Sequence, residues 1–129
     1  MGKSTSDKKR MREEFKKRIY CFTLRLIEFV DNLPKTPSCR IIGGQLLRSG
    51  TSIGANYVEA YASSSKKDFT NYFSIALKSA NESKFWLVLL KDSQKASKEK
   101  TEMLLKEVTE IANILASSIL TLRGKRKDF

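Results

Sequence analysis

The apolar residues of this chain recur at alternating steps of four and three residues, and this spacing limits the fold more than any other feature. It is clearest near the start, where the series reads Phe15, Ile19, Phe22, Leu26, Phe29 and Leu33. An α-helix turns once in about 3.6 residues, so this spacing puts the series on one face, as in the seam of a bundle. It predicts a helix over about 11–33.

Three further segments repeat the spacing, and each predicts another helix. We place these helices at about 37–61, 66–92 and 98–123. Their seams comprise Ile42, Leu46, Gly50, Ile53, Tyr57 and Ala60, then Phe69, Phe73, Ala76, Ala80, Ser83, Leu87 and Leu90, and finally Leu104, Val108, Ile111, Leu115, Ile119 and Leu122. No alternating strand pattern competes with them.

Residues typical of helix ends separate the four segments. Pro34 ends the first, because the residue before a proline disfavours the helical conformation. Thr36 followed by Pro37 is a typical helix start. Ser65 begins a capping-box pattern, and Gly124 suits the position just past a helix end.

Long helices joined by short connections favour antiparallel neighbours. We therefore predict an all-α fold, an antiparallel up-down-up-down four-helix bundle. The length of 129 residues fits one domain, 1–129. Residues 1–10 and 124–129 are expected to extend from it as a basic N-terminal arm and a C-terminal tail.

The second predicted helix contains four glycines, Gly43, Gly44, Gly50 and Gly54. Each costs about 1 kcal/mol in helix propensity relative to alanine. Such a cost indicates that a neighbour closely approaches the backbone. Tight packing within the bundle is the favoured interpretation, and a ligand against the backbone is the alternative.

The residue inventory argues against catalysis and metal binding. The chain has no histidine, the usual general base and the commonest metal ligand. Its two cysteines, Cys21 and Cys39, cannot supply a zinc site and are expected to be reduced. The Glu-x-x-His pairs of di-iron bundles are absent. We expect neither a cofactor nor a metal ion, and no enzyme; acid-base catalysis by Glu59, Glu82 and Arg48 lacks a matched pair.

No apolar run is long enough for a membrane span, and residues 1–11 lack the apolar core of a secretory signal. A cytoplasmic protein without a membrane partner is therefore expected. The net charge is +11, from 25 Lys and Arg against 14 Asp and Glu, and it favours polyanionic partners.

The predicted topology would gather basic residues from three segments at one end of the bundle. They are Lys8, Lys9, Arg10, Arg12, Lys16, Lys17, Lys66, Lys67, Arg123, Lys125, Arg126 and Lys127, with Arg18 nearby. Clustered Lys and Arg are what phosphate contacts need, although a run of charge can also be only a solvated surface. Phe129 and Tyr61 are the aromatic candidates for base stacking at this end, so contacts to the backbone or to structured RNA are favoured over base readout.

A polar stripe lies beside the seam of the second helix. It predicts a network of Gln45, Arg48, Ser52, Asn56 and Glu59, with Ser79 and Glu82 from the third helix and Ser49 within the stripe. Matching positions across the connections puts Arg48 level with Ser79 and Glu82, and Glu59 level with Arg12 and Lys16. The favoured interpretation is a hydrogen-bond network that fixes register or faces another subunit. A polar ligand site is the alternative.

The run from Gln45 to Glu59 resembles the Q-x-x-R-x-x-x-S-I-x-x-N-I-x-E-G signature of a bacterial four-helix bundle family, first noticed in intervening sequences of large-subunit ribosomal RNA genes. The run from Ser65 to Glu82 is similar to the S-x-x-x-F-x-x-F-L-x-I-A-x-x-S-x-x-E pattern of the same family. Ala60 stands where the family usually has glycine, and Leu77 and Lys78 replace its usual Arg-Gly pair. The resemblance covers about 15–122.

The resemblance implies a homo-oligomer, commonly a pentamer, without established enzymatic activity. A related branch comprises the accessory proteins of diversity-generating retroelements, which partner a reverse transcriptase and its RNA. Two hypotheses remain. The first is a nucleic-acid-associated bundle, with RNA favoured and a reverse transcriptase as a further partner. The second is a homo-oligomeric scaffold that binds a protein partner.

Overall fold

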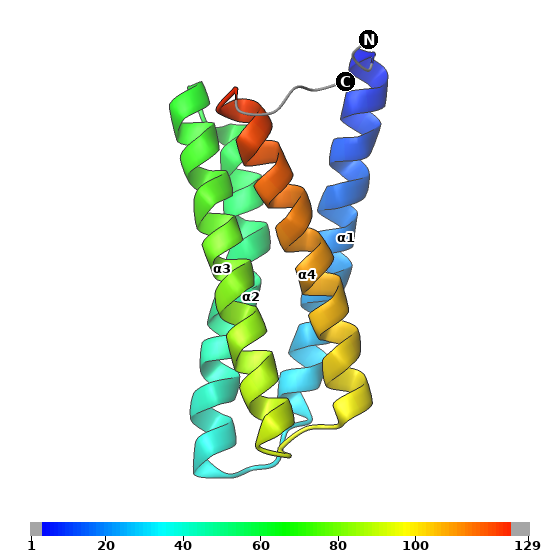
Figure 1. Cartoon of the computed structure of the whole chain (residues 1–129), viewed down its shortest axis with the longest axis vertical. Coiled ribbons are helices and arrows are strands. Elements are labelled where there is room, and N and C mark those ends of the chain that lie inside the picture. Colours follow the sequence, from blue (N-terminus) through cyan, green and yellow to red (C-terminus); the bar gives the residue numbers. More distant parts are fainter. Residues whose placement is uncertain (1–3, 125–129) are drawn as a thin grey trace.

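The computed structural model describes residues 4–124, which form four helices in an antiparallel up-down-up-down bundle (Figure 1). The helices are α1 (Thr5–Asp31), α2 (Pro37–Ala62), α3 (Lys66–Asp92) and α4 (Lys98–Leu122). The predicted all-α fold and its topology are therefore confirmed, and three of the four helices lie within one residue of their expected bounds.

Each helix begins after a serine or threonine whose hydroxyl oxygen caps the first turn. Ser4, Thr36, Ser65 and Ser97 accept hydrogen bonds from the backbone N–H three residues later, at 3.0 to 3.3 Å. These bonds satisfy donors that the helix itself leaves unpaired. The hydroxyl side chains of the connections thus fix where the helices start.

The predicted N-terminal arm over residues 1–10 is wrong for its second half, because α1 begins at Thr5. Periodicity detects a helix only where apolar residues are present, and the first large apolar residue after the start is Met11. The preceding turns need no core contact. Ser4 caps them and Arg10 pairs with Asp7 at 3.3 Å, so the basic residues 8–10 are held on a helix.

The four seams meet in one buried core. Phe22, Leu26, Leu46, Leu87 and Leu115 are each fully buried there. The first positions of three seams, Phe15, Ile42 and Phe69, are only partly buried. The central seam positions that the spacing predicts are therefore confirmed as core. Among residues 4–124, no helix is both long and apolar enough to cross a membrane.

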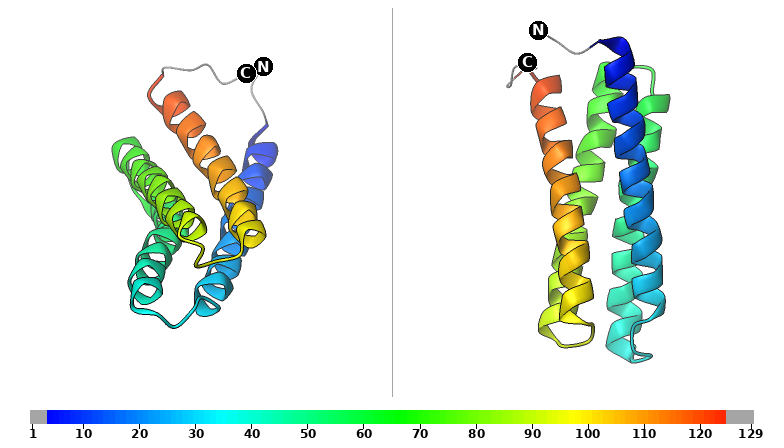
Figure 2. Two further views of the ribbon diagram at one scale, coloured as in Figure 1. Left: turned by 60° about the horizontal axis from the view of Figure 1, so that its bottom comes forward. Right: turned by 90° about the vertical axis from the view of Figure 1, so that its right-hand side faces the viewer.

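The helices are not equally close along their length. Figure 1 and the left view of Figure 2 show α1 and α4 spreading apart toward the end where α1 begins, while α2 and α3 stay adjacent. An ion-pair cluster ties α1 to α4 near mid-length: the Arg18 guanidinium donates to Glu107 at 2.7 and 3.0 Å and also pairs with Glu110. The start of α1 is therefore positioned mainly by its packing against α2.

Candidate nucleic-acid interface

Three segments distant in the sequence lie at one end of the bundle: the start of α1, the connection between α2 and α3, and the end of α4 (Figure 1). We call their basic side chains the basic pole. It comprises Lys8, Lys9, Arg10, Arg12, Lys66, Lys67 and Arg123 at this end, together with Lys16 and Lys17 farther along α1. Lys125, Arg126 and Lys127, which the sequence also predicts there, lie outside the described residues.

The charge is unevenly divided between the two halves of the bundle. The half with the pole, residues 4–18, 50–78 and 111–124, has eleven Lys and Arg and five Asp and Glu. The other half, residues 19–49 and 79–110, has ten Lys and Arg and eight Asp and Glu. The excess positive charge of the described residues therefore lies mainly around the pole, which makes this end the stronger attractor of anions.

Most cations of the pole have no acidic partner. Among the described residues, the only ion pair of the pole joins Arg10 to Asp7 at 3.3 Å, and both side chains are largely exposed. Arg123 donates to the Ser74 hydroxyl at 3.5 Å, which leaves its charge unneutralised. Arg18 differs from these cations, because near the middle of α1 it pairs with two carboxylates. The charge of the pole thus remains available to a ligand.

An aromatic cluster supports the pole from within the bundle. The ring of Tyr57 lies 5.3 Å from that of Phe15, 5.0 Å from Tyr61 and 5.5 Å from Phe73. Its hydroxyl donates to the Arg12 carbonyl at 3.1 Å, and burial raises the pKa of Tyr57 far above its ordinary value. Tyr57 therefore stays a protonated donor that fixes the start of α1 to α2.

The Arg12 guanidinium lies over the ring of Tyr61, 4.9 Å from its centroid. The Tyr61 ring also contacts Phe69 edge-on at 4.9 Å. Arg12 and Phe69 therefore contact the ring of Tyr61, which the sequence suggested as a candidate for base stacking. Phe129, the other aromatic candidate, lies outside the described residues.

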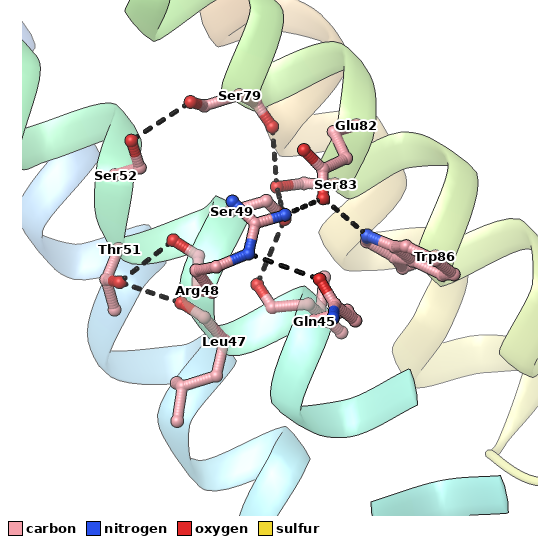
Figure 3. A network of polar contacts seen from close by, with 11 residues as sticks. Gln45, Leu47, Arg48, Ser49, Thr51, Ser52, Ser79, Glu82, Ser83 and Trp86 are labelled. Atoms are coloured by element: carbon pink, nitrogen blue, oxygen red, sulfur yellow. Dashed lines mark hydrogen bonds and ion pairs between the residues drawn. The ribbon is translucent and has the colours of Figure 1, made fainter. Parts of the chain in front are cut away.

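The polar network of α2 and α3 forms around three direct contacts between the helices (Figure 3). Arg48 forms an ion pair with Glu82 and donates to Gln45 at 3.2 Å. Glu82 also accepts from the Trp86 indole N–H at 2.9 Å. The Glu82 carboxylate that pairs with Arg48 is therefore also held by the indole of Trp86.

Hydroxyl groups make the other two contacts of the network. The buried Ser49 and Ser83 hydroxyls lie 2.8 Å apart, and Ser79 donates to Ser52 at 3.0 Å. The Asn56 side-chain amide adds a bond to the Ser52 hydroxyl at 2.9 Å. Among residues 4–124, every buried side-chain nitrogen and oxygen has a partner, so the buried part of the network is satisfied within the protein.

The structure brings together six of the seven residues that the sequence predicts for this network, and Glu59 is the exception. Glu59 is exposed and, among the described residues, makes no hydrogen bond or ion pair. Its position in the polar stripe predicted a partner, but its place on α2 leaves the side chain exposed near the basic pole. The six joined residues link α2 to α3 through the Arg48–Glu82 pair and the Ser79–Ser52 bond, and their role in fixing register stays a prediction.

Comparison with known proteins now gives the chain a family. The model for the 23S rRNA-intervening sequence protein family matches residues 12–117, which span all four helices. This chain belongs to that family. A crystal structure of a protein of unknown function from Bacteroides thetaiotaomicron, assigned to the S23 ribosomal protein family, is similar to it. The two share 38% identity with a TM-score of 0.77, over 81% of this chain and 97% of the other. None of the curated proteins compared matches it.

The basic pole extends beyond the part of the chain that the family model matches. Arg12, Lys16, Lys17, Lys66 and Lys67 lie within the match, whereas residues 8–10 and 123 lie outside it. Neither the family description nor that of the similar structure names an enzymatic reaction. Among the described residues, no three potential metal ligands gather.

Sequence reasoning missed Tyr20, which is 65% exposed on α1. It lines a groove of about 410 Å³ between α1 and α2, beside Lys16 and Lys17. The sequence signal that could have identified Tyr20 is its position off the apolar seam, one helical turn after two lysines. Nothing in the sequence alone shows that α2 leaves space beside it.

Proposed function

We propose that this family member binds RNA by contacting phosphates with its basic pole, without catalysing a reaction. The observation that carries the proposal is the concentration of unneutralised Lys and Arg from three segments at one end. Each phosphate contact releases condensed counterions from the nucleic acid, and this release supplies most of sequence-independent affinity.

The family description supports RNA over DNA. It refers to intervening sequences of 23S rRNA, and the similar structure is assigned to a ribosomal protein family. The chemistry of the pole agrees with backbone recognition, because exposed lysines on helices position a protein on phosphates and carry no sequence information. Shape and strand type, rather than base sequence, would then decide which RNA binds.

The salt dependence of RNA affinity tests the proposal. We expect the logarithm of the association constant to fall linearly with the logarithm of salt concentration, by about 0.7 per phosphate contact on single strands. Fluorescence anisotropy with a labelled RNA from 50 to 300 mM KCl measures the slope. No binding at 50 mM KCl, or an affinity independent of salt, would contradict it.

A second candidate is a homo-oligomeric scaffold for a protein partner. Exposed apolar side chains favour it: on α3, Phe85 is 59% and Ile75 44% exposed, and on α2, Ile41 is 68% exposed. Aromatic residues such as Phe85 are enriched at protein interfaces. Light scattering would give the assembly mass, for which the family resemblance predicts a pentamer. The partnership with a reverse transcriptase likewise stays a prediction, tested by co-purification of the two proteins.

A further inference from the structure

The groove between α1 and α2 combines an exposed aromatic ring, small side chains and lysines beside the basic pole. The two helices run antiparallel next to each other (Figure 2). The groove has a volume of about 410 Å³, within the usual range for a small-molecule site. Its lining includes Lys16, Lys17 and Tyr20 of α1 and Thr51, Gly54 and Ala55 of α2.

Small residues on α2 leave the space beside Tyr20. Thr51, Gly54 and Ala55 face it across the groove, and none of them fills the gap. A Cβ at Gly54 would lie 3.2 Å from Ile19, so α2 already approaches the groove floor closely. Tyr20 makes no ring contact with any described aromatic residue, which leaves a face of its ring open.

The rim of the groove is cationic. Lys16 and Lys17 precede Tyr20 by one helical turn and belong to the basic pole, while Glu13 is the one acid in the lining. Among the described residues, neither lysine has an ion-pair partner. Proteins hold single-stranded nucleic acid with aromatic rings on which the bases stack and with neighbouring cations that contact the phosphate backbone.

We propose that this groove holds one unpaired nucleotide of a bound RNA, with the base stacked on Tyr20 and a phosphate on Lys16 or Lys17. The proposal rests on the proposed function and adds a preference for unpaired strands. Tyr61, which is 43% exposed, is less suited to this role because the Arg12 guanidinium already lies over its ring. The cationic rim and the exposed ring together suit a nucleotide, which carries both a phosphate and a base.

The test compares three variants on a single-stranded 12-mer RNA and on a duplex of the same length. Tyr20→Ala should weaken single-strand binding about tenfold, as expected for one lost stacked base, and change duplex binding less than about twofold. Tyr20→Phe should keep the wild-type affinity, because it keeps the ring. Phe85→Ala removes an equally exposed aromatic from α3 and is the matched control. Circular dichroism checks that each variant is folded.

The groove itself is tested by Ala55→Leu, which adds a side chain within it while leaving Tyr20 in place. We expect a selective loss of single-strand affinity here too. Equal losses on both strand types, no loss for Tyr20→Ala, or an effect equal to that of Phe85→Ala would overturn the proposal. So would an unchanged RNA affinity with a smaller assembly mass, which would assign the groove to a second copy. If the wild type binds neither RNA, the proposed function fails as well.

Discussion

At the scale of single residues, the glycines of α2 have different structural roles. A Cβ added to Gly50 would lie 2.0 Å from a terminal methyl of Leu26, which is fully buried. A Cβ added to Gly44 would meet nothing within 4 Å. Tight packing, the interpretation that the sequence favoured, therefore explains Gly50. It does not explain Gly44, for which the structure offers no reason.

We predict opposite effects when alanine replaces these two glycines. Gly50→Ala should lower the free energy of unfolding by about 1 kcal/mol net, because overpacking costs about 1–3 kcal/mol and helix propensity returns about 1. Gly44→Ala should raise it by up to about 1 kcal/mol. Urea denaturation measures both. If Gly50→Ala stabilises as much as Gly44→Ala, Leu26 moves freely and the close approach has no energetic importance.

At the scale of helices, the sequence predicted what periodicity and capping encode. The seams and the starts at Pro37, Lys66 and Lys98 follow from apolar spacing and hydroxyl caps. The start of α1 does not, because its first turns touch no core and Ser4 is one of several polar residues there. Register was predicted to within a turn, enough to place Arg48 beside Glu82 but too coarse to show that Glu59 points outward.

The link between α1 and α4 should make stability depend on pH. Hydrogen bonds from Arg18, and then its charge, lower the pKa of Glu107 below its ordinary value. A carboxylate with a depressed folded pKa stabilises the fold above its unfolded pKa, and this contribution is lost as the pH falls through the folded pKa.

We therefore predict that Glu107→Gln lowers the free energy of unfolding by about 0.5–1 kcal/mol at pH 7, the size expected for a partly exposed pair. The difference from wild type should shrink as the pH falls through the folded pKa of Glu107, which lies below 4.5. Denaturation at a series of pH values measures it. A difference that persists unchanged at pH 3 would show that packing, rather than charge, links the two helices.

The serine contact between α2 and α3 should behave as one unit. Each hydroxyl also lies within hydrogen-bond distance of a carbonyl of its own helix, Ser83 of Ser79 at 2.8 Å and Ser49 of Leu46 at 3.2 Å, so either hydroxyl can donate the bond that they share at 2.8 Å. Ser49→Ala and Ser83→Ala should each cost about 1 kcal/mol of unfolding free energy.

The double variant tests this coupling. It should cost less than the sum of the two single variants, because both of them lose the same bond. Thermal or urea denaturation of the four proteins completes the cycle. Strict additivity would mean that the two hydroxyls stabilise their own helices independently and do not couple α2 to α3.

At the scale of the whole molecule, the bundle topology makes one end basic. That convergence could be foreseen once four antiparallel helices were predicted, because charge positions are fixed by the sequence. The groove beside Tyr20 could not, since it depends on how closely Gly54 lets α2 approach Ile19 and on what the neighbouring side chains leave open. An exposed tyrosine alone does not distinguish a binding site from ordinary surface.

The central claim is that RNA binds at the basic pole, and that the net positive charge of the protein alone does not account for the binding. Two variants with equal loss of charge test it most directly. One replaces Lys8, Lys9, Lys66 and Lys67 with glutamine at the pole, and the other replaces Lys35, Lys95, Lys98 and Lys100 with glutamine at the opposite end. The measurement is the salt dependence of RNA affinity for both variants and the wild type.

The pole variant should bind RNA more weakly than wild type, with a salt slope shallower by about 0.7 for each lost contact on single strands. The opposite-end variant should keep nearly the wild-type affinity and slope. Equal weakening in the two variants would show that net charge alone attracts RNA, and it would contradict the account.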